Sequence, residues 1–231
     1  LILILSFAFP GKLDYIDAYQ VAVQKLIVHQ LDKVRPQQLL QQEHADQYTA
    51  GAIQYRELIP YLDSITPGTL FFSEHGRQVS NIFIKSDWKH CGIFLGTLQQ
   101  IENHWGEAHA LVTFLRPFYN KKNDYLVFDS SYELGVAIHS IREMAGLNNT
   151  STLRKLLLFE FTQDTAAMNQ ALSDNLVHLG KHYDFTFVPD NDEAFYCSEF
   201  LDEVLPLEET FFSPSATIAG RPLLLPSDQV N

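Results

Sequence analysis

The sequence predicts an α+β fold, in which a small sheet and several helices form one domain behind an N-terminal helical extension. Three observations predict it. Apolar residues recur at helical spacing between residues 14 and 65, short β-like runs follow from residue 66 onward, and 46% of the 231 residues are apolar. A chain of this length and apolar content buries enough surface for a substantial core.

Residues 1–13 begin with the run LILILSFAFPG, which is apolar and ends in Pro and Gly. The run is too short to span a bilayer but fits the hydrophobic part of an export signal. We expect a truncated signal segment here, with a buried first strand as the alternative. The signal interpretation places the mature protein in the periplasm or at the surface of a bacterium, without a membrane span.

Residues 14–65 are expected to form the helical extension. Tyr19, Val23 and Leu26 illustrate its helical spacing, and Pro36 permits a break between two of its helices. The segment carries no pattern of catalytic residues, so we expect the chemistry to lie in residues 66–231.

The domain at 66–231 is expected to combine strands with a helical insertion. Strands are predicted over 69–72, 81–85, 88–95, 125–129, 135–139 and 154–161. The segment near 97–118 is predicted to form one or two inserted helices. A further amphipathic helix is expected over 164–179, with Gly180 at its C-terminal cap.

The charge and the cysteine count exclude several classes of protein. Sixteen Lys and Arg stand against 28 Asp and Glu, so the net charge is −12. An acidic chain without a basic run is not expected to bind nucleic acid or to adhere to anionic lipid. Two cysteines, Cys91 and Cys197, are too few for a disulfide framework, so each thiol needs its own explanation.

Cys197 lies in the stretch DNDEAFYCSEFLDEVL, at the start of a predicted helix whose apolar face includes Phe200, Leu201 and Val204. Asp190 and Glu193 have the spacing of a capping box, which allows the helix to begin before Cys197. A thiol in a first helical turn meets backbone N–H groups that favour the thiolate. Taken alone, however, a free cysteine is more often a buried apolar residue.

His90 is the histidine best placed to activate a thiol. In the strand SDWKHCGIFLG, Trp88, His90, Gly92 and Phe94 share one face, and Gly92 leaves room for a group beside the imidazole. Cys91 points to the other, aliphatic face and is expected in the core. By contrast, His104, Glu107 and His109 lack the spacing of a zinc site, because five residues separate the two rings by about 140° on a helix. We expect no metal and no cofactor.

The segments PGTLFF, WKHCGIFLG, YLVFDSSYELGVAIHS, LGKHYDFTF and FYCSEFLDEV occur in an informative order. Together they resemble the circularly permuted papain-like thiol hydrolases, the YiiX-like branch of the NlpC superfamily, which is related to lecithin retinol acyltransferase. In such proteins the histidine strand precedes the cysteine helix. The resemblance covers about residues 67–205 and implies a small antiparallel sheet packed on the cysteine-bearing helix.

The resemblance implies a nucleophile at Cys197, a general base and acid at His90, and an orienting group on the strand that follows. Asp129 is the preferred orienting group because a carboxylate can fix the imidazole tautomer, with Ser130 or Ser131 as alternatives. Tyr183 and Ser198 are the candidates for binding the substrate near the oxyanion.

The expected function is therefore exported hydrolysis of an amide or ester through a thioester. The substrate classes left open are small molecules, peptides, cell-wall peptides and lipid acyl groups. A thiol acyltransferase acting on lipids and a non-catalytic binding module on the same fold are the alternatives. A surface lipoprotein or structural protein with a core cysteine is a further class, and labelling of the thiol separates it from the enzyme, because a core cysteine resists alkylation whereas an ion-paired one does not.

Overall fold

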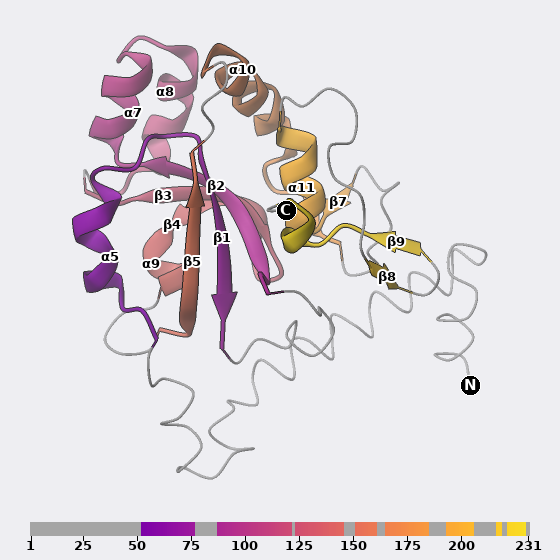
Figure 1. Ribbon diagram of the computed structural model, residues 1–231. Coiled ribbons are helices and arrows are strands. Elements are labelled where there is room, and N and C mark those ends of the chain that lie inside the picture. The colour runs from indigo at the N-terminus through magenta and orange to yellow at the C-terminus, as the bar shows by residue number, and fades with distance from the viewer. Residues whose placement is uncertain are drawn as a thin grey trace.

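The computed structural model describes residues 52–76, 87–121, 123–145, 151–160, 165–184, 193–205, 216–218 and 221–229. At its centre lies a five-stranded antiparallel sheet of order β4-β3-β2-β1-β5 (Figure 1). Its strands are β1 (Thr69–His75), β2 (His90–Gly96), β3 (Leu126–Ser131), β4 (Gly135–Ser140) and β5 (Leu153–Phe159). β2 is the middle strand, so its first residue lies between β1 and β3.

The inner strands are apolar runs because helices cover both faces of the sheet. Ile93 and Leu95 of β2 pack on one side, whereas Phe94 packs on the other, and all three are almost completely buried. This explains why β2 does not show the alternation of apolar and polar residues that a strand with one solvent face would have.

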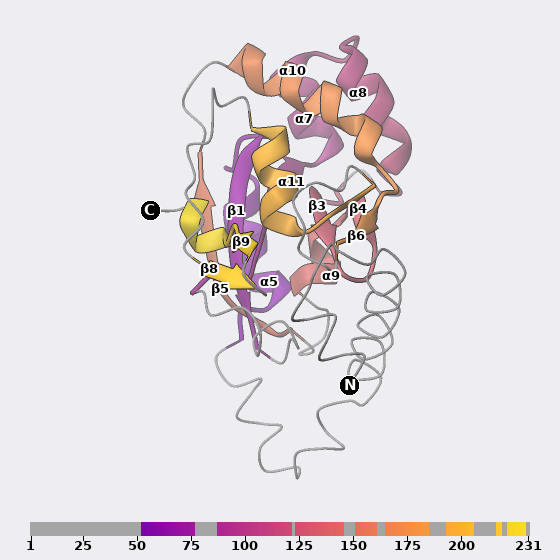
Figure 2. The same cartoon turned by 90° about the vertical axis from the view of Figure 1, so that its right-hand side faces the viewer.

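Four helices share a core with the first of these faces: α7 (Leu98–Trp105), α8 (Ala110–Leu115), α10 (Thr165–Asn175) and α11 (Cys197–Val204). Figures 1 and 2 show α11 lying against the sheet with the other three helices grouped beyond one end of it. The second face packs against α5 (Tyr55–Leu62) and α9 (Ile141–Ala145). The cysteine helix therefore packs on β2 and β3 of the sheet and also contacts α10.

Short elements complete the described part of the chain. Two-residue strands β6 (His182–Tyr183) and β7 (Ala194–Phe195) pair in parallel just before α11. Strands β8 (Ala216–Ile218) and β9 (Arg221–Leu223) form an antiparallel pair. The 3₁₀ turns are η1 (Arg116–Phe118), η2 (Leu176–His178) and η3 (Pro226–Gln229).

The predicted α+β architecture, with an antiparallel sheet packed on the cysteine helix, is confirmed. Five of the six expected strands overlap observed ones, and the insertion near 97–118 forms α7, α8 and η1. The strand expected at 81–85, the segment 1–13 and residues 14–51 of the extension lie outside the described residues. The described end of the extension, α5, buries Leu58 and Leu62 against the sheet.

The expectation that the cysteine helix begins before Cys197 is wrong. The chain stays extended through Ala194–Phe195 because these residues pair with β6, and Tyr196 is the N-cap at φ −89° and ψ 165°. Glu199, rather than Glu193, supplies the carboxylate of the capping box, accepting from the Tyr196 N–H at 3.3 Å. Cys197 is therefore the first residue of α11.

Candidate active site

The position of Cys197 at the N-terminus of α11 is fixed by the packing of the helix that follows it and by a hydrogen bond to the strand that precedes it. Phe200, Leu201 and Val204 are fully buried and fix the helix on the sheet. The Ser130 hydroxyl on β3 donates to the Phe195 carbonyl at 2.6 Å, which ties the strand before the helix to the central sheet. Cys197 as a whole is only 4% exposed. The first turn of a helix presents backbone N–H groups and a positive dipole end, and both stabilise a thiolate.

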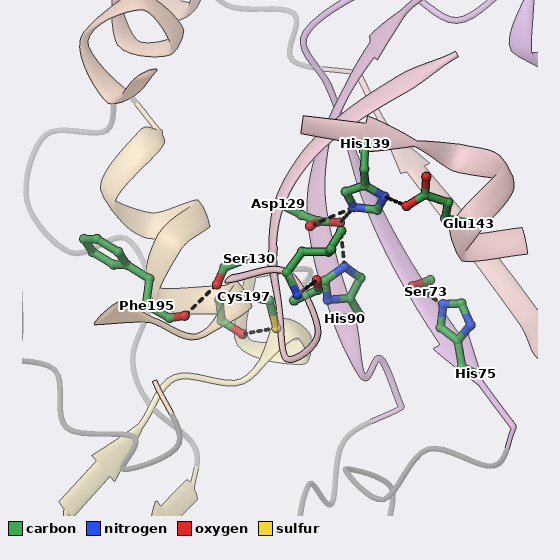
Figure 3. Close-up of polar contacts among 12 residues, drawn as sticks. Ser73, His75, His90, Asp129, Ser130, His139, Glu143, Phe195 and Cys197 are labelled. Atoms are coloured by element: carbon green, nitrogen blue, oxygen red, sulfur yellow. Dashed lines mark hydrogen bonds and ion pairs between the residues drawn. The ribbon is translucent and has the colours of Figure 1, made fainter. Parts of the chain in front are cut away.

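His90, the first residue of β2, is oriented by Asp129. The two are joined through the His90 Nε2 and the Asp129 Oδ2, which lie 2.9 Å apart. The Phe71 ring lies 5.7 Å from the imidazole, centroid to centroid, and restricts its rotation further. With Nε2 taken by the carboxylate, Nδ1 is the ring nitrogen left to interact with Cys197, which contributes to the raised pKa of His90. Figure 3 shows the labelled Asp129, His90 and Cys197 following one another in this order.

Gly92 makes this arrangement possible, although in a different way from the one expected. It pairs directly with Asp129 across the sheet. A Cβ on Gly92 would lie 2.6 Å from the Asp129 Cβ and 2.8 Å from the Phe71 ring. The space that glycine leaves is therefore filled by the carboxylate side chain and the phenyl ring that hold His90.

The ionisation of His90 and Asp129 follows from their contact. Burial alone would lower the pKa of His90, but the charge of Asp129, its hydrogen bond and the interaction with Cys197 raise the pKa to about 10. Burial would raise the pKa of Asp129, but His139 and His90 together hold it well below its ordinary value. The pair is accordingly an imidazolium and a carboxylate at neutral pH.

The Cys197 thiol ionises readily. Its pKa lies well below the ordinary value because of a hydrogen bond from Cys91 and, against the opposing effect of burial, because of His90. Burial raises the pKa of Cys91, and the Cys197 thiolate beside it raises that pKa further. A negative sulfur at Cys197 next to a positive His90 is the resting state that these shifts favour.

Cys91 has more than the packing role expected for it. It is fully buried in the apolar core, as predicted. Its thiol also donates to the Gln229 Oε1 at 3.5 Å, so its single proton has both this oxygen and the Cys197 sulfur as acceptors. Gln229 in turn donates from Nε2 to the Ser198 carbonyl at 2.9 Å. The end of the described chain is thereby attached to the first turn of α11.

The two residues expected near the oxyanion both lie close to Cys197. The Ser198 Oγ is 3.9 Å from the Cys197 sulfur and the residue is 1% exposed. Tyr183 pairs with Phe195 across β6 and β7, and burial followed by the Cys197 charge raises the pKa of its phenol. The alternatives to Asp129 have other partners, since Ser130 bonds Phe195 and the Ser131 Oγ accepts from the Leu134 N–H at 3.3 Å.

Two histidines near the site were missed at the sequence level. His139 on β4 directs its Nε2 at both Asp129 oxygens, each at 3.0 Å. His75 on β1 is buried, with its Nε2 3.1 Å from the Ser73 Oγ, and Ser73 pairs with His90 across the sheet. The hairpin from 126 to 140 carried the signal for His139, because Val127 pairs with His139 and a diagonal neighbour on the same face is Asp129.

The histidines of the insertion lie away from this site. The His109 Nδ1 accepts from the Leu111 N–H at 3.2 Å at the start of α8, and the His104 ring rests edge-on against Trp105. Within the described ranges, no three His, Cys, Asp or Glu side chains are grouped so as to hold a metal ion. None of the described helices has both the length and the apolar character that a membrane crossing requires.

The fold and the site together define the class. An antiparallel sheet carries the histidine, a packed helix carries the cysteine, and the histidine strand comes first along the chain, which is the order of a permuted papain-like hydrolase. A family model described as permuted papain-like amidase enzyme, YaeF/YiiX, C92 family, matches residues 64–224. The chain belongs to this C92 family of permuted papain-like amidases. No protein of curated function matches it.

Proposed function

We propose that this chain is a cysteine amidase in which Cys197 is the nucleophile, His90 the general base and acid, and Asp129 the group that orients His90. The observation that carries the proposal is the 2.9 Å contact between the His90 Nε2 and the Asp129 Oδ2. It fixes the imidazole with Nδ1 toward the thiol, so that the proton which the thiol loses is held where the leaving group needs it.

The reaction begins when the Cys197 sulfur attacks the carbonyl carbon of the substrate. A C–S bond forms and the carbonyl electron pair moves to oxygen, where the Cys197 backbone N–H at the helix N-terminus stabilises the negative charge. Tyr183 and Ser198 are the side chains proposed to contact the substrate there, because the Ser198 Oγ lies 3.9 Å from the sulfur and the Cys197 charge acts on the Tyr183 phenol. When the C–N bond breaks, the leaving nitrogen takes the proton of His90.

The second half of the reaction regenerates the ion pair. His90, now neutral, removes a proton from water, and the resulting hydroxide attacks the thioester carbon. The C–S bond then breaks, the acid product leaves, and Cys197 and His90 return to thiolate and imidazolium. A lipid acyltransferase would differ only in using an acceptor other than water. We propose water and a peptide amide, because the family is one of amidases.

Alkylation of Cys197 by iodoacetamide tests the proposed ion pair without a known substrate. An ordinary thiol with a pKa near 8.5 becomes about tenfold more ionised for each unit between pH 6 and 8. The labelling rate of Cys197 should instead be nearly constant over this range and regain the tenfold dependence in His90→Ala. Cys91 is the internal control and is followed by peptide mapping in the same molecule, because both thiols are buried but the pKa of Cys91 is raised whereas that of Cys197 is lowered.

A second variant separates the role of His90 from a general effect of losing a histidine. His182 is exposed on β6, and His182→Ala should leave the flat profile unchanged. The catalytic proposal fails if Cys197 resists iodoacetamide at pH 6 in the folded wild-type protein. It also fails if the alkylation rate of Cys197 rises tenfold for each pH unit.

The substrate class is tested with a panel of amide substrates resembling cell-wall peptides against a panel of lipid esters. Cys197→Ala serves as the blank for both panels. Turnover of the amides, absent in the blank, supports the amidase proposal. Turnover confined to the esters would refute it.

We also propose that the protein is exported, because of the apolar run LILILSFAFPG. Expression of the full chain behind an initiating Met in a bacterium, followed by fractionation, tests this. The protein should appear in the periplasm or at the surface with the first residues removed. Retention of the intact chain in the cytosol would contradict the proposal.

A further inference from the structure

Asp129 lies between two imidazoles rather than beside one. On the side away from His90, the His139 Nε2 of β4 lies 3.0 Å from each of its oxygens, Oδ1 and Oδ2 (Figure 3). On the other side the His90 Nε2 contacts Oδ2 alone, at 2.9 Å. A carboxylate held through both oxygens by one donor has little freedom to rotate about its Cβ–Cγ bond.

Burial makes the second imidazole necessary. The Asp129 side chain is 0% exposed, and a buried carboxylate is unfavourable unless it is paired and hydrogen-bonded. Its ionised state relies on His139 first and on His90 second, because the charge of His139 is the largest influence that lowers its pKa. Without His139, one histidine would have to hold the carboxylate and activate the thiol as well.

The charged groups around His139 show that its main interaction is with Asp129. Burial alone would lower its pKa, but Asp129, with a smaller effect from Glu143 and against that of His90, raises it. Its Nδ1 lies 3.7 Å from the Glu143 Oε2 on α9, and that carboxylate is 62% exposed. An exposed partner at this distance contributes little. The strong contacts of His139 are therefore those with Asp129.

We propose that His139 is a positioning residue of the active site, which fixes the Asp129 carboxylate so that Oδ2 stays in contact with His90. The inference rests on the proposed roles of Cys197 and His90. His139 does not touch the reacting atoms in this scheme. It sets the orientation of His90 through Asp129, and thereby the fraction of Cys197 that is ionised to the thiolate.

Two amide variants test the inference with closely similar side chains. The Nε2 of Gln reaches roughly where the histidine Nε2 lies, so His139→Gln keeps a donor for Asp129. The amide of Asn corresponds to Nδ1, so His139→Asn is polar but does not reach the carboxylate. Because Gln keeps the donor but not the charge of His139, we expect the Cys197 alkylation rate at pH 6 to fall less in the Gln variant than in the Asn variant, where it should fall at least tenfold. Equal rates in the two folded variants would overturn the inference.

A double-mutant cycle tests whether the effect passes through Asp129. In the Asp129→Asn background, His139→Asn should change the rate less than about threefold, because no carboxylate remains to be positioned. An undiminished tenfold loss in that background would mean that His139 acts by another route and would overturn the inference. Circular dichroism and urea unfolding of each variant exclude loss of the fold as the cause.

The wild-type profile separates this test from that of the proposed function. If wild-type Cys197 shows no His90-dependent reactivity, the proposed function fails and the inference fails with it. If wild-type Cys197 shows that reactivity and the cycle is additive, the inference about His139 alone is refuted.

Discussion

The substitution Gly92→Ala provides a strict test of the site, because it adds one methyl group between the residues that hold His90. The new Cβ would lie 2.6 Å from the Asp129 Cβ and 2.8 Å from two carbons of the Phe71 ring. Carbon atoms in contact prefer about 3.5 to 4.0 Å, so Asp129 and Phe71 must each retreat by about 1 Å. Both residues pair with Gly92 in the sheet, and their side chains are buried in close packing, at 0% and 1% exposure, which opposes such a movement.

The displacement can be translated into energies. Overpacking of a dense core by a methyl group costs about 1–3 kcal/mol of unfolding free energy. A shift of about 1 Å would lengthen the His90–Asp129 contact to about 4 Å, beyond the range of a hydrogen bond. Misplacement by that distance can lower a reaction rate about 100-fold. We therefore expect both a loss of stability and a loss of the flat alkylation profile of Cys197.

Urea unfolding and the alkylation rate between pH 6 and 8 measure the two effects, with Gly76→Ala as the matched control. Gly76 follows β1, and a Cβ there meets only the side chain of Arg154, whose Nε at 3.0 Å belongs to a flexible group. The control should therefore lose little stability and keep the flat profile. A Gly92→Ala variant that matches it in both measurements would refute the reasoning that Asp129 and Phe71 fill this space.

Two further predictions concern stability. Ser130→Ala removes the buried 2.6 Å hydrogen bond to the Phe195 carbonyl and should lower the free energy of unfolding, measured in urea, by about 1–3 kcal/mol. The control Ser131→Ala, at the turn, should lower it by less than about 1 kcal/mol. Equal losses in the two variants would contradict the role given to Ser130. Burial, with a smaller effect of His90, lowers the pKa of His75 to about 3, so only the unfolded chain takes up this proton between pH 6.5 and 3. The free energy of unfolding should therefore fall by about 2 kcal/mol between pH 8 and 5 on account of His75. His75→Gln should remove that share of the pH dependence. An identical pH dependence in the variant would show that His75 is not held neutral in the folded protein.

Local patterns in the sequence were not sufficient by themselves, because a lone cysteine is more often buried in the core. Strand alternation drew attention to His90 beside Gly92, and the resemblance to the permuted papain-like hydrolases then pointed to Cys197, His90 and Asp129 together. The structure brings these side chains into contact because Gly92 pairs with Asp129, which puts the carboxylate diagonally opposite His90. Their catalytic roles stay predictions until the alkylation profile is measured.

The contact between His139 and Asp129 was not predicted from the sequence, because it depends on the register of the β3–β4 hairpin. Asp129 and His139 are ten residues apart, and only the pairing of Ser131 with Gly135 brings them to one face with the spacing of diagonal neighbours. A shift of one residue in that turn would have turned His139 to the opposite face. Gln229 depends on tertiary structure to a still greater degree, since its contact with Cys91 spans 138 residues of sequence.

The charges of the site alternate, and this alternation explains how an acidic chain keeps them buried. The pKa is raised at His139, lowered at Asp129, raised at His90 and lowered at Cys197, so the cationic and the anionic forms are favoured in alternation. Each charge has a neighbour of opposite sign, so none is left uncompensated in the low-dielectric interior. Removing an inner member leaves two charges without their shared partner, whereas removing an end member leaves one. Asp129→Asn and His90→Ala should therefore each lower the Cys197 alkylation rate at pH 6 more than His139→Asn does, and a larger loss in His139→Asn would contradict this order.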